Sequence, residues 1–452
     1  MGQKQKENSS IVKKNSSIVT IFTLWNTLMG VSLMSMPWAL HQAGLFLGPF
    51  LFVAMELLCC YTAYLILQSP KGLEKIDPTS VEFQEICRAY FGKTGEILAL
   101  VFSLFILCGA IFTYFVLMSN FLFFSGELIY GLAHPSGQAS VIEEPARCDF
   151  HCQLNEQTNQ SSFNSTEPVI VFGLTFHQLW QLRLTVPIII AIIIFSLLNF
   201  KSPTFFTKFG VLGTISIIYI VVFTTARLFK CGIYVSLTDP TSEAYVQSIS
   251  WRFPALTGTL TVSFFLHMGI LTIFRNQKYP ENNTRDLSLG FALAGISYII
   301  VAVAFYLSFP FAKSCIHDNL LNNFSADYIY GAIARVLLLF QLITITPIMT
   351  FFIRTQLSCF IFKTSYPGLR YVLILNIIVA TCGALVAIFY PNVGTIVRYV
   401  GAVTGVVYTY ALPCLVYMKE QHLQNKLTPL KLIAHSSIIV FGVANFLAQF
   451  FL

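Results

Sequence analysis

Residues 25–38 read Trp-Asn-Thr-Leu-Met-Gly-Val-Ser-Leu-Met-Ser-Met-Pro-Trp, and they lie inside an apolar run that begins near position 18. A helix that faces only lipid has no use for so many polar and small residues in one stretch. Gly30 and Pro37 bracket a point where we expect the helix to unwind, close to the hydroxyl of Ser32. Unwound backbone is tolerated inside a membrane only around a buried polar cavity, because its amides and carbonyls need partners. The stretch therefore predicts a broken helix and a binding site.

The freed ends of a broken helix offer amides to a carboxylate, and carbonyls to an ammonium group or a sodium ion. Asn26 adds a side-chain oxygen of the kind that suits a hard cation. The alternative interpretation is that the small residues only allow close packing against a neighbouring helix.

A second run, residues 255–274, contains Gly-Thr-Leu-Thr-Val-Ser-Phe-Phe-Leu-His-Met-Gly at 258–269. Glycines and hydroxyls again interrupt an apolar segment, and Ser263 and His267 are its most polar members. If the fold is an inverted repeat of five plus five helices, this run corresponds to the first one in the second repeat. The pair of interrupted runs is our strongest indication of where a substrate binds.

The composition is that of an integral membrane protein: 56% of the 452 residues are apolar and 10% are charged, against about 25% charged in soluble domains. A bilayer core of about 30 Å needs about 20 apolar residues per helix. Apolar runs separated by charged or turn-rich breaks predict about eleven transmembrane helices, near residues 18–41, 44–68, 94–130, 181–199, 209–230, 255–274, 286–310, 330–360, 369–390, 394–418 and 431–452.

We therefore expect an all-α integral membrane fold with broken helices one and six. A short cytosolic segment, 1–17, precedes a transmembrane domain, 18–452. That domain divides into a first repeat (18–230) with a luminal loop (131–176), a second repeat (255–418) and one extra helix (431–452).

Charge and glycosylation signals agree on the orientation. Loops 69–93, 200–208, 275–285, 361–368 and 419–430 carry twelve basic residues, whereas the opposite loops carry few, and this places the basic loops and the N-terminus in the cytosol. The acceptor sequences at Asn159, Asn164 and Asn323 fall on the other side, where glycosylation occurs. The C-terminus is then luminal or extracellular.

Four of the eleven cysteines, Cys148, Cys152, Cys231 and Cys315, lie in or beside polar loops and are the disulfide candidates. We weigh a bridge from Cys315 to Cys148 or Cys152 against a local Cys148–Cys152 pair, and the sequence leaves both open.

Several classes of function lack the residues they need. The sequence contains no zinc-ligand cluster, no nucleophile elbow and no phosphate-binding glycine loop, so we expect neither an enzyme nor a resident cofactor. The net charge of +7 is spread along the chain, which argues against nucleic acid as a partner and leaves the lipid bilayer. His435, at the start of the last run, is a candidate pH-responsive group, although a satisfied interfacial histidine is the commoner case.

The eighth run carries Gln341, Thr344, Thr346, Pro347 and Thr350. Pro347 opens the helical ladder about four residues earlier, near Thr344, whose hydroxyl could complete a cation site with Asn26. The alternative is that these hydroxyls bond back to carbonyls of their own helix.

The stretches NTLMGVSLMSMPW, LNFKSPTFFTKFGVLGT, FFLHMG, ITITPIMTFFIR and FYPNVGTIVRYVGAVTG together resemble the amino acid/auxin permease superfamily and, within it, the sodium-coupled neutral amino acid transporters. The resemblance runs from about residue 16 to the C-terminus. It implies the LeuT-like fold of eleven helices and the transport of amino acids, with sodium as a possible coupling ion.

The resemblance also implies roles for particular residues. Asn26 matches an asparagine associated with sodium, and Thr344 or Thr346 would be its partner in the eighth helix. The unwound segment that receives the amino acid backbone is matched by Thr27, Leu28, Met29, Gly30 and Val31. Cys315 matches the outer-loop cysteine of the family disulfide.

The resemblance is greatest to the lysosomal, arginine-sensing branch of that family, which favours the lysosomal membrane and leaves the plasma membrane as the alternative. That branch has threonine where this chain has Val31, which argues against a preference for arginine. It also carries a long cytosolic N-terminal region that recruits signalling partners, whereas about 17 residues precede the first run here, so we expect no such partner. The main alternative to a transporter is a receptor that binds an amino acid but transports little.

Overall fold

The computed structural model describes residues 14–72, 81–134, 147–152, 170–171, 174–200, 204–207, 210–364 and 366–451. The fold is helical, apart from one two-stranded antiparallel ribbon of β1 (Ile170–Val171) and β2 (Leu174–Thr175). The α-helices are α1 (Ser17–Leu28), α2 (Met36–Ala43), α3 (Leu47–Gln68), α4 (Phe83–Ala133), α5 (Phe176–Leu179), α6 (Thr185–Leu198), α7 (Thr204–Thr207), α8 (Gly210–Cys231), α9 (Pro254–Ser263), α10 (Ile270–Arg275), α11 (Asn283–Ser308), α12 (Ile329–Phe362), α13 (Leu369–Phe389), α14 (Val393–Thr404), α15 (Leu412–Leu423) and α16 (Pro429–Ala448).

Within the described residues, eight helices are long and apolar enough to cross a membrane, and a ninth crossing is the bent pair of segments 17–28 and 31–43. The helix α6 is apolar but shorter, and α9 and α10 taken singly have only 10 and 6 residues. The all-α membrane fold is thus confirmed, and the count of eleven stays a prediction.

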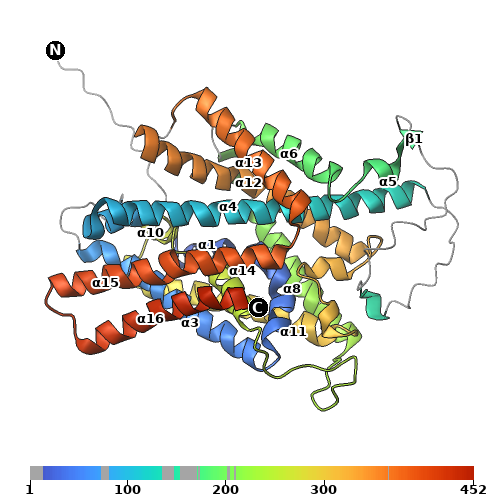
Figure 1. Ribbon diagram of the computed structural model, residues 1–452, viewed down its shortest axis with the longest axis horizontal. Helices are drawn as coiled ribbons and strands as arrows, with labels where there is room; N and C mark the ends of the chain where they lie inside the picture. The colour runs from blue at the N-terminus through green and yellow to red at the C-terminus, as the bar shows by residue number, and fades with distance from the viewer. Residues whose placement is uncertain are drawn as a thin grey trace.

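The longest helix, α4, runs along most of the length of the bundle in Figure 1. It packs against α6, α12, α13 and α14. The helix α4 begins at Phe83, where the Glu82 and Glu85 side chains form a capping box, but it has a kink at Gly92, close to residue 94, where we predicted the span to begin. The extra residues join the span at Gly92, whose positive φ of 67° a glycine adopts without strain.

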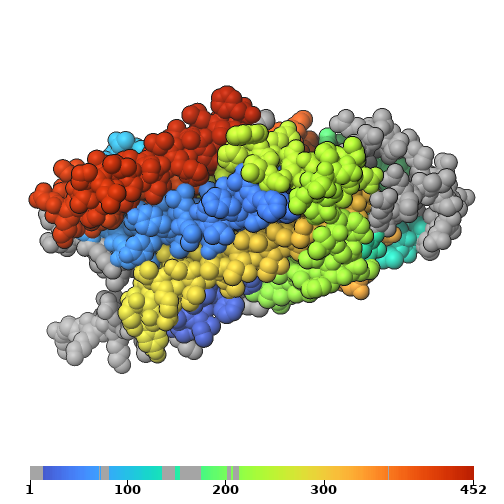
Figure 2. Space-filling view, turned by 90° about the horizontal axis from the view of Figure 1, so that it is seen from below, coloured from blue at the N-terminus to red at the C-terminus, as the bar shows by residue number. Residues whose placement is uncertain are grey.

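One face of the bundle consists of α16, α3 and α11 lying side by side (Figure 2). The Tyr61 hydroxyl on α3 lies 2.8 Å from Nε2 of His435 on α16. The other ring nitrogen of His435 lies 2.6 Å from the Lys431 carbonyl, and its ring stacks on Tyr417. Both ring nitrogens of His435 therefore have hydrogen-bond partners, and its role as a pH-responsive group stays a prediction.

Two disulfides connect the loops at one end of the bundle, which we call the disulfide end. Cys152 pairs with Cys315, and Cys148 pairs with Cys231. The long-range bridge to Cys315 is thus formed, the local Cys148–Cys152 pair is not, and the partner of Cys148 is a cysteine whose pairing we did not predict. Asp149 adds ion pairs to Arg227 and Lys230 at 2.7 and 2.9 Å.

The glycosylation prediction is wrong for Asn323. Its side chain is 0% exposed, and the amide nitrogen to which a glycan would be attached donates to the carbonyls of His151 and Cys315. Its oxygen accepts from the His317 amide. Asn323 therefore holds the loops of the disulfide end together, while Asn159 and Asn164 lie outside the described residues.

Candidate functional site

The first interrupted run is broken as predicted. The helix α1 ends at Leu28, and a short 3-10 helix, η1 (Val31–Ser35), leads into α2. The two halves meet at an angle of 54°. At the break, Gly30 has an extended backbone (φ −99°, ψ −173°), and its amide donates to the Leu28 carbonyl only two residues back. The regular helical ladder is therefore interrupted between Leu28 and Val31.

The second interrupted run is also broken as predicted. The helix α9 ends at Ser263 and α10 begins at Ile270. The intervening His267 is fully buried, and its Nε2 lies 2.8 Å from the Thr62 hydroxyl on α3. Its other ring nitrogen, Nδ1, has no partner within the part of the chain that the structure describes. The Ser263 hydroxyl donates to the Thr259 carbonyl of its own helix.

A residue that the sequence analysis missed joins the two breaks. Tyr298, on α11, is fully buried, and its hydroxyl donates to the Leu28 carbonyl at 2.7 Å. The same hydroxyl lies 3.2 Å from the Ser32 hydroxyl and 3.4 Å from the Ser263 carbonyl. A tyrosine in an apolar run is usually interpreted as an aromatic packing residue. No pattern in the sequence therefore indicated that Tyr298 contacts both helix breaks.

A narrow cavity opens beside the first break, with room for about one water molecule. Its walls come from the broken segment, α4, α8 and α12, and none of its residues carries a charge: Gly30, Val31, Leu33, Met34, Leu117, Phe121, Ile217, Leu338, Gln341 and Leu342. The Gln341 side-chain oxygen is buried there, with no hydrogen-bond partner among the described residues. The cavity thus has apolar walls and one polar group from α12.

The predicted substrate residues divide at the break. Gly30 and Val31 line the cavity, and Ser32 meets Tyr298, as described above. Leu28 and Met29 are buried at the break. Thr27 does not belong to this group: it lies within α1, is exposed, and donates to the Thr23 carbonyl one turn back. Its placement in the unwound segment is wrong, because the helix continues through Leu28.

The predicted sodium ligands are not seen to converge. The Asn26 side-chain oxygen accepts a hydrogen bond of 3.0 Å from Thr214 on α8. The hydroxyls of Thr344 and Thr346 both donate to carbonyls of their own helix, which is the alternative that the sequence left open. The helix α12 continues through Pro347. A sodium site at Asn26 stays a prediction, and Thr214 is the neighbouring residue whose hydroxyl such a site would include.

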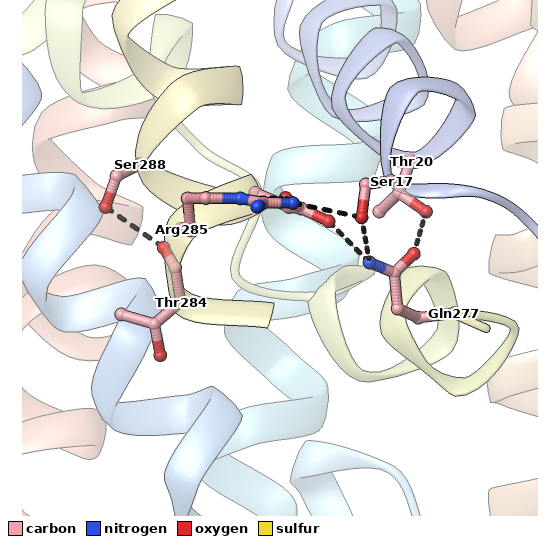
Figure 3. Close-up of polar contacts among 7 residues, drawn as sticks. Ser17, Thr20, Gln277, Thr284, Arg285 and Ser288 are labelled. Carbon is pink, nitrogen blue, oxygen red and sulfur yellow. Dashed lines mark hydrogen bonds and ion pairs between the residues drawn. The ribbon is translucent and has the colours of Figure 1, made fainter. Parts of the chain in front are cut away.

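A polar cluster fastens the base of α1 at the end opposite the disulfides (Figure 3). We call it the α1 latch: Ser17, Thr20, Gln277, Arg285 and Asp286. Gln277 is the hub, because its amide oxygen accepts from Thr20 and its nitrogen donates to Asp286 at 2.5 Å and to Ser17 at 3.4 Å. Asp286 is fully buried and also accepts from the adjacent Arg285.

The backbone reinforces the α1 latch. The Asn15 amide donates to the Asn276 carbonyl at 2.7 Å, and the Lys278 amide donates to the Asn15 carbonyl at 2.9 Å. One turn away, Arg275 on α10 pairs with Glu82 at the start of α4 at 3.0 Å. The half-helices α1 and α10 are therefore both bonded to their neighbours at this end of the bundle.

Comparison with known proteins identifies what the chain is similar to. Residues 13–131 and 162–451 match the family described as transmembrane amino acid transporter protein. A Caenorhabditis elegans protein named sodium-coupled neutral amino acid transporter 9 homolog is 45% identical, over 98% of this chain and 75% of its own length. The neutral amino acid transporter 9 of Rattus norvegicus is 38% identical, over 99% of this chain and 81% of its own.

The fold also has a counterpart among solved structures. The crystal structure of MhsT in complex with L-phenylalanine superimposes with a TM-score of 0.54, over 97% of this chain and 99% of that one. The two sequences are 11% identical, so the likeness shows the fold alone.

Proposed function

Because the chain belongs to the transmembrane amino acid transporter protein family, we propose that it carries neutral amino acids across a membrane by alternating access. The observation that carries this proposal is the meeting of two helix breaks at one buried hydroxyl, beside a cavity between α4, α8 and α12. Non-helical backbone is tolerated at membrane depth only where it is buried in protein or lines a cavity. Their ends offer the amides and carbonyls that the charged backbone of an amino acid requires.

The cavity walls favour a substrate with a neutral side chain. They are apolar except for Gln341, and none of the lining residues is a carboxylate. An arginine side chain would therefore leave its charge buried and unpaired, which costs several kcal/mol. Apolar walls favour an aliphatic side chain, which requires the cavity to widen beyond its room for about one water molecule, and an amide side chain would find a partner at Gln341.

We propose sodium as the coupling ion, held near Asn26. The support is an asparagine oxygen and a threonine hydroxyl within 3.0 Å of each other, close to the break in the first span. Oxygen ligands of this kind suit a hard cation. A proton is the alternative, and the experiment below separates the two.

We further propose that the α1 latch faces the cytosol and that the membrane is lysosomal. The support for the orientation is the basic loops, which lie in the cytosol under the positive-inside rule. The support for the organelle is the sequence resemblance to a lysosomal branch of the family. The disulfides are consistent with an oxidising lumen on the opposite side.

The test is uptake of radiolabelled leucine, glutamine and arginine into proteoliposomes, with sodium against choline outside. We expect leucine or glutamine uptake that requires sodium and is lost in Asn26→Ala. Thr27→Val is the matched control, because the Thr27 hydroxyl is exposed and bonds only within α1; it should transport like the wild type. Saturable binding without flux under any gradient would instead identify an amino acid receptor.

A further inference from the structure

Three basic side chains gather at the disulfide end of the bundle, and we call them the basic cluster: His41, Arg252 and Lys313. His41 lies in the last turn of α2, Arg252 lies just before the start of α9, and Lys313 follows the end of α11. Within the part of the chain that the structure describes, none of the three forms an ion pair with a carboxylate. The basic cluster therefore carries positive charge that no described acid neutralises.

The packing of α2 against α11 brings the members of the basic cluster together. The ring of Tyr306 on α11 lies between two of them: its centroid is 6.2 Å from that of the His41 ring and 5.3 Å from Nζ of Lys313. Arg252 is held nearby, because the backbone amide two residues before it donates to the Ala43 carbonyl at the end of α2. The charges of Arg252 and Lys313 are both close enough to act on the imidazole of His41.

Lys313 is the member that most needs a negatively charged partner. It is 2% exposed, and its ammonium donates to the Phe309 carbonyl at 2.6 Å. That carbonyl belongs to the C-terminal cap of α11, so Lys313 interacts favourably with the helix end, and the rings of Tyr306 and Phe309 add a weaker attraction. An ammonium has three N–H donors. Two of them have no acceptor among the described residues, and a buried charge without full compensation is costly.

His41 and Arg252 add further donors around the same place. Nδ1 of His41 is buried and has no hydrogen-bond partner in the described part of the chain. An imidazole carries one N–H when neutral and two when charged, so it can donate to an anion in either state. Arg252 is exposed, and its guanidinium is suited to binding an anion. The basic cluster therefore has buried donors on its inner side and one that faces solvent.

We propose that the basic cluster binds a compact monovalent anion, chloride or a carboxylate group, between the ends of α2 and α11 and the start of α9. The anion must be compact, because Lys313 is almost fully buried. It would accept the remaining hydrogen bonds of Lys313 and His41 and neutralise their surplus charge. None of the three residues lines the cavity beside the first break, so this site is separate from it and its occupancy does not depend on transport.

The first measurement is the melting temperature of the purified full-length protein at about pH 6, below the pKa of about 7 to which burial lowers Lys313. Sodium chloride replaces sodium gluconate at constant ionic strength, so that only the size and chemistry of the anion change. We expect a rise that saturates with chloride, because a ligand that binds only the folded state stabilises it. The rise should be lost in Lys313→Met.

Arg252→Gln tests the site without changing a buried residue. The chloride concentration that gives half of the rise should increase about two- to fivefold, the effect of losing one exposed charge. Arg370→Gln, at an exposed arginine at the start of α13, is the matched control and should behave like the wild type. If Lys313→Met does not fold, Arg252→Gln decides, since its side chain is exposed. An equal rise in all variants, or no rise in the wild type with either chloride or acetate, would overturn the proposal.

The second measurement is the width of the ³⁵Cl NMR signal, which increases when chloride exchanges with a site on the protein. We expect broadening by the wild type and Arg370→Gln and much less by Lys313→Met. Acetate is the probe for a carboxylate: if it narrows the signal again, the site takes both kinds of anion, and if acetate alone raises the melting temperature, the ligand is a carboxylate. Equal broadening by the wild type and Lys313→Met would place the bound chloride elsewhere and overturn the proposal. Neither measurement involves amino acid uptake, so a failure of the proposed function would leave both results unchanged.

Discussion

The two ends of the bundle are closed by different kinds of bond. At the disulfide end, two covalent bridges and the fully buried Asn323 fasten the loops to one another. At the opposite end, the base of α1 is held by the side chains of the α1 latch (Figure 3). Two backbone hydrogen bonds of Asn15 hold it as well. Hydrogen bonds can break and reform during a conformational change, whereas disulfides persist.

This difference indicates which part of the molecule would move during the proposed transport. Alternating access requires one group of helices to rock against another around a fixed site. The loops at the disulfide end join α4, α8 and α11, which therefore behave as one scaffold. The half-helix α1 is joined to that scaffold through reversible contacts alone, both at its base and along α8 and α11, so it is the segment we expect to swing.

The largest effect should come from the scaffold. Cys315→Ser removes a bridge that closes a loop of 163 residues, and such removals cost about 2–5 kcal/mol of unfolding free energy. We expect a marked fall in the melting temperature, with little change in hydrogen exchange across α1. Cys359→Ser, at an exposed free cysteine, is the control. An equal fall in both variants would show that the bridge contributes nothing to the scaffold.

The next effect should come from the α1 latch. Asp286→Asn removes a buried charge that accepts from both Gln277 and Arg285, which weakens the latch by about 2–4 kcal/mol. We expect hydrogen exchange in residues 17–28 to accelerate by an order of magnitude or more while the disulfide end is unaffected. Glu281→Gln changes an exposed acid in the same junction and should exchange like the wild type. Slow exchange of α1 in Asp286→Asn would contradict the idea that the latch holds it.

A further effect concerns the pH dependence of stability and belongs to the disulfide end. Burial lowers the pKa of Lys313, which follows α11, from 10.5 to about 7. Between these two values the unfolded chain binds more protons than the folded one, so stability rises with pH from about 7 to about 10.5. Below about pH 7 this group causes no further change. The rise in melting temperature with pH should be smaller in Lys313→Met. The control is Lys419→Met, which changes an exposed lysine and should keep the rise. If both variants show the same pH profile, Lys313 is not the source of the rise.

The smallest effect should follow from one hydrogen bond of the latch. Thr20→Val keeps the shape of the side chain and removes the hydroxyl that donates to Gln277. The loss of about 1 kcal/mol should speed hydrogen exchange at the base of α1 about fivefold. In the control, Thr23→Val, the lost hydroxyl bonds only within α1. If the control exchanges as fast as Thr20→Val, the hydroxyl of Thr20 has no special role in the latch.

The sequence predicted the breaks but not what joins them. Gly30 and the hydroxyls around it are out of place in a lipid-facing helix, and this local conflict was enough to locate the first break. Tyr298 gives no such signal, since an aromatic residue in an apolar run has many explanations. Its contacts with Leu28 and Ser263 depend on how α11 packs between two distant spans, which local patterns do not reveal.

The cysteine and sodium predictions show the same limit. Loop polarity selected the four cysteines that form disulfides, but the pairing of Cys148 with Cys231 depends on where α8 ends in space. Asn26 was recognised as a polar residue in an apolar span, yet its hydrogen-bond partner is Thr214 rather than a threonine of α12. Residue chemistry could be anticipated in both cases, whereas the neighbours required the tertiary structure.

The two disulfides have a consequence for biosynthesis. Cys148 and Cys152 are made early and lie close together, but their partners follow only 83 and 163 residues later. Until the ribosome has supplied Cys231 and Cys315, the two early thiols can pair with each other, and that bond must then be exchanged. Thiol–disulfide exchange is slow without a catalyst. Recombinant production should therefore succeed best in a host whose secretory pathway contains a disulfide isomerase, and its yield should depend on that enzyme more than on the rate of translation.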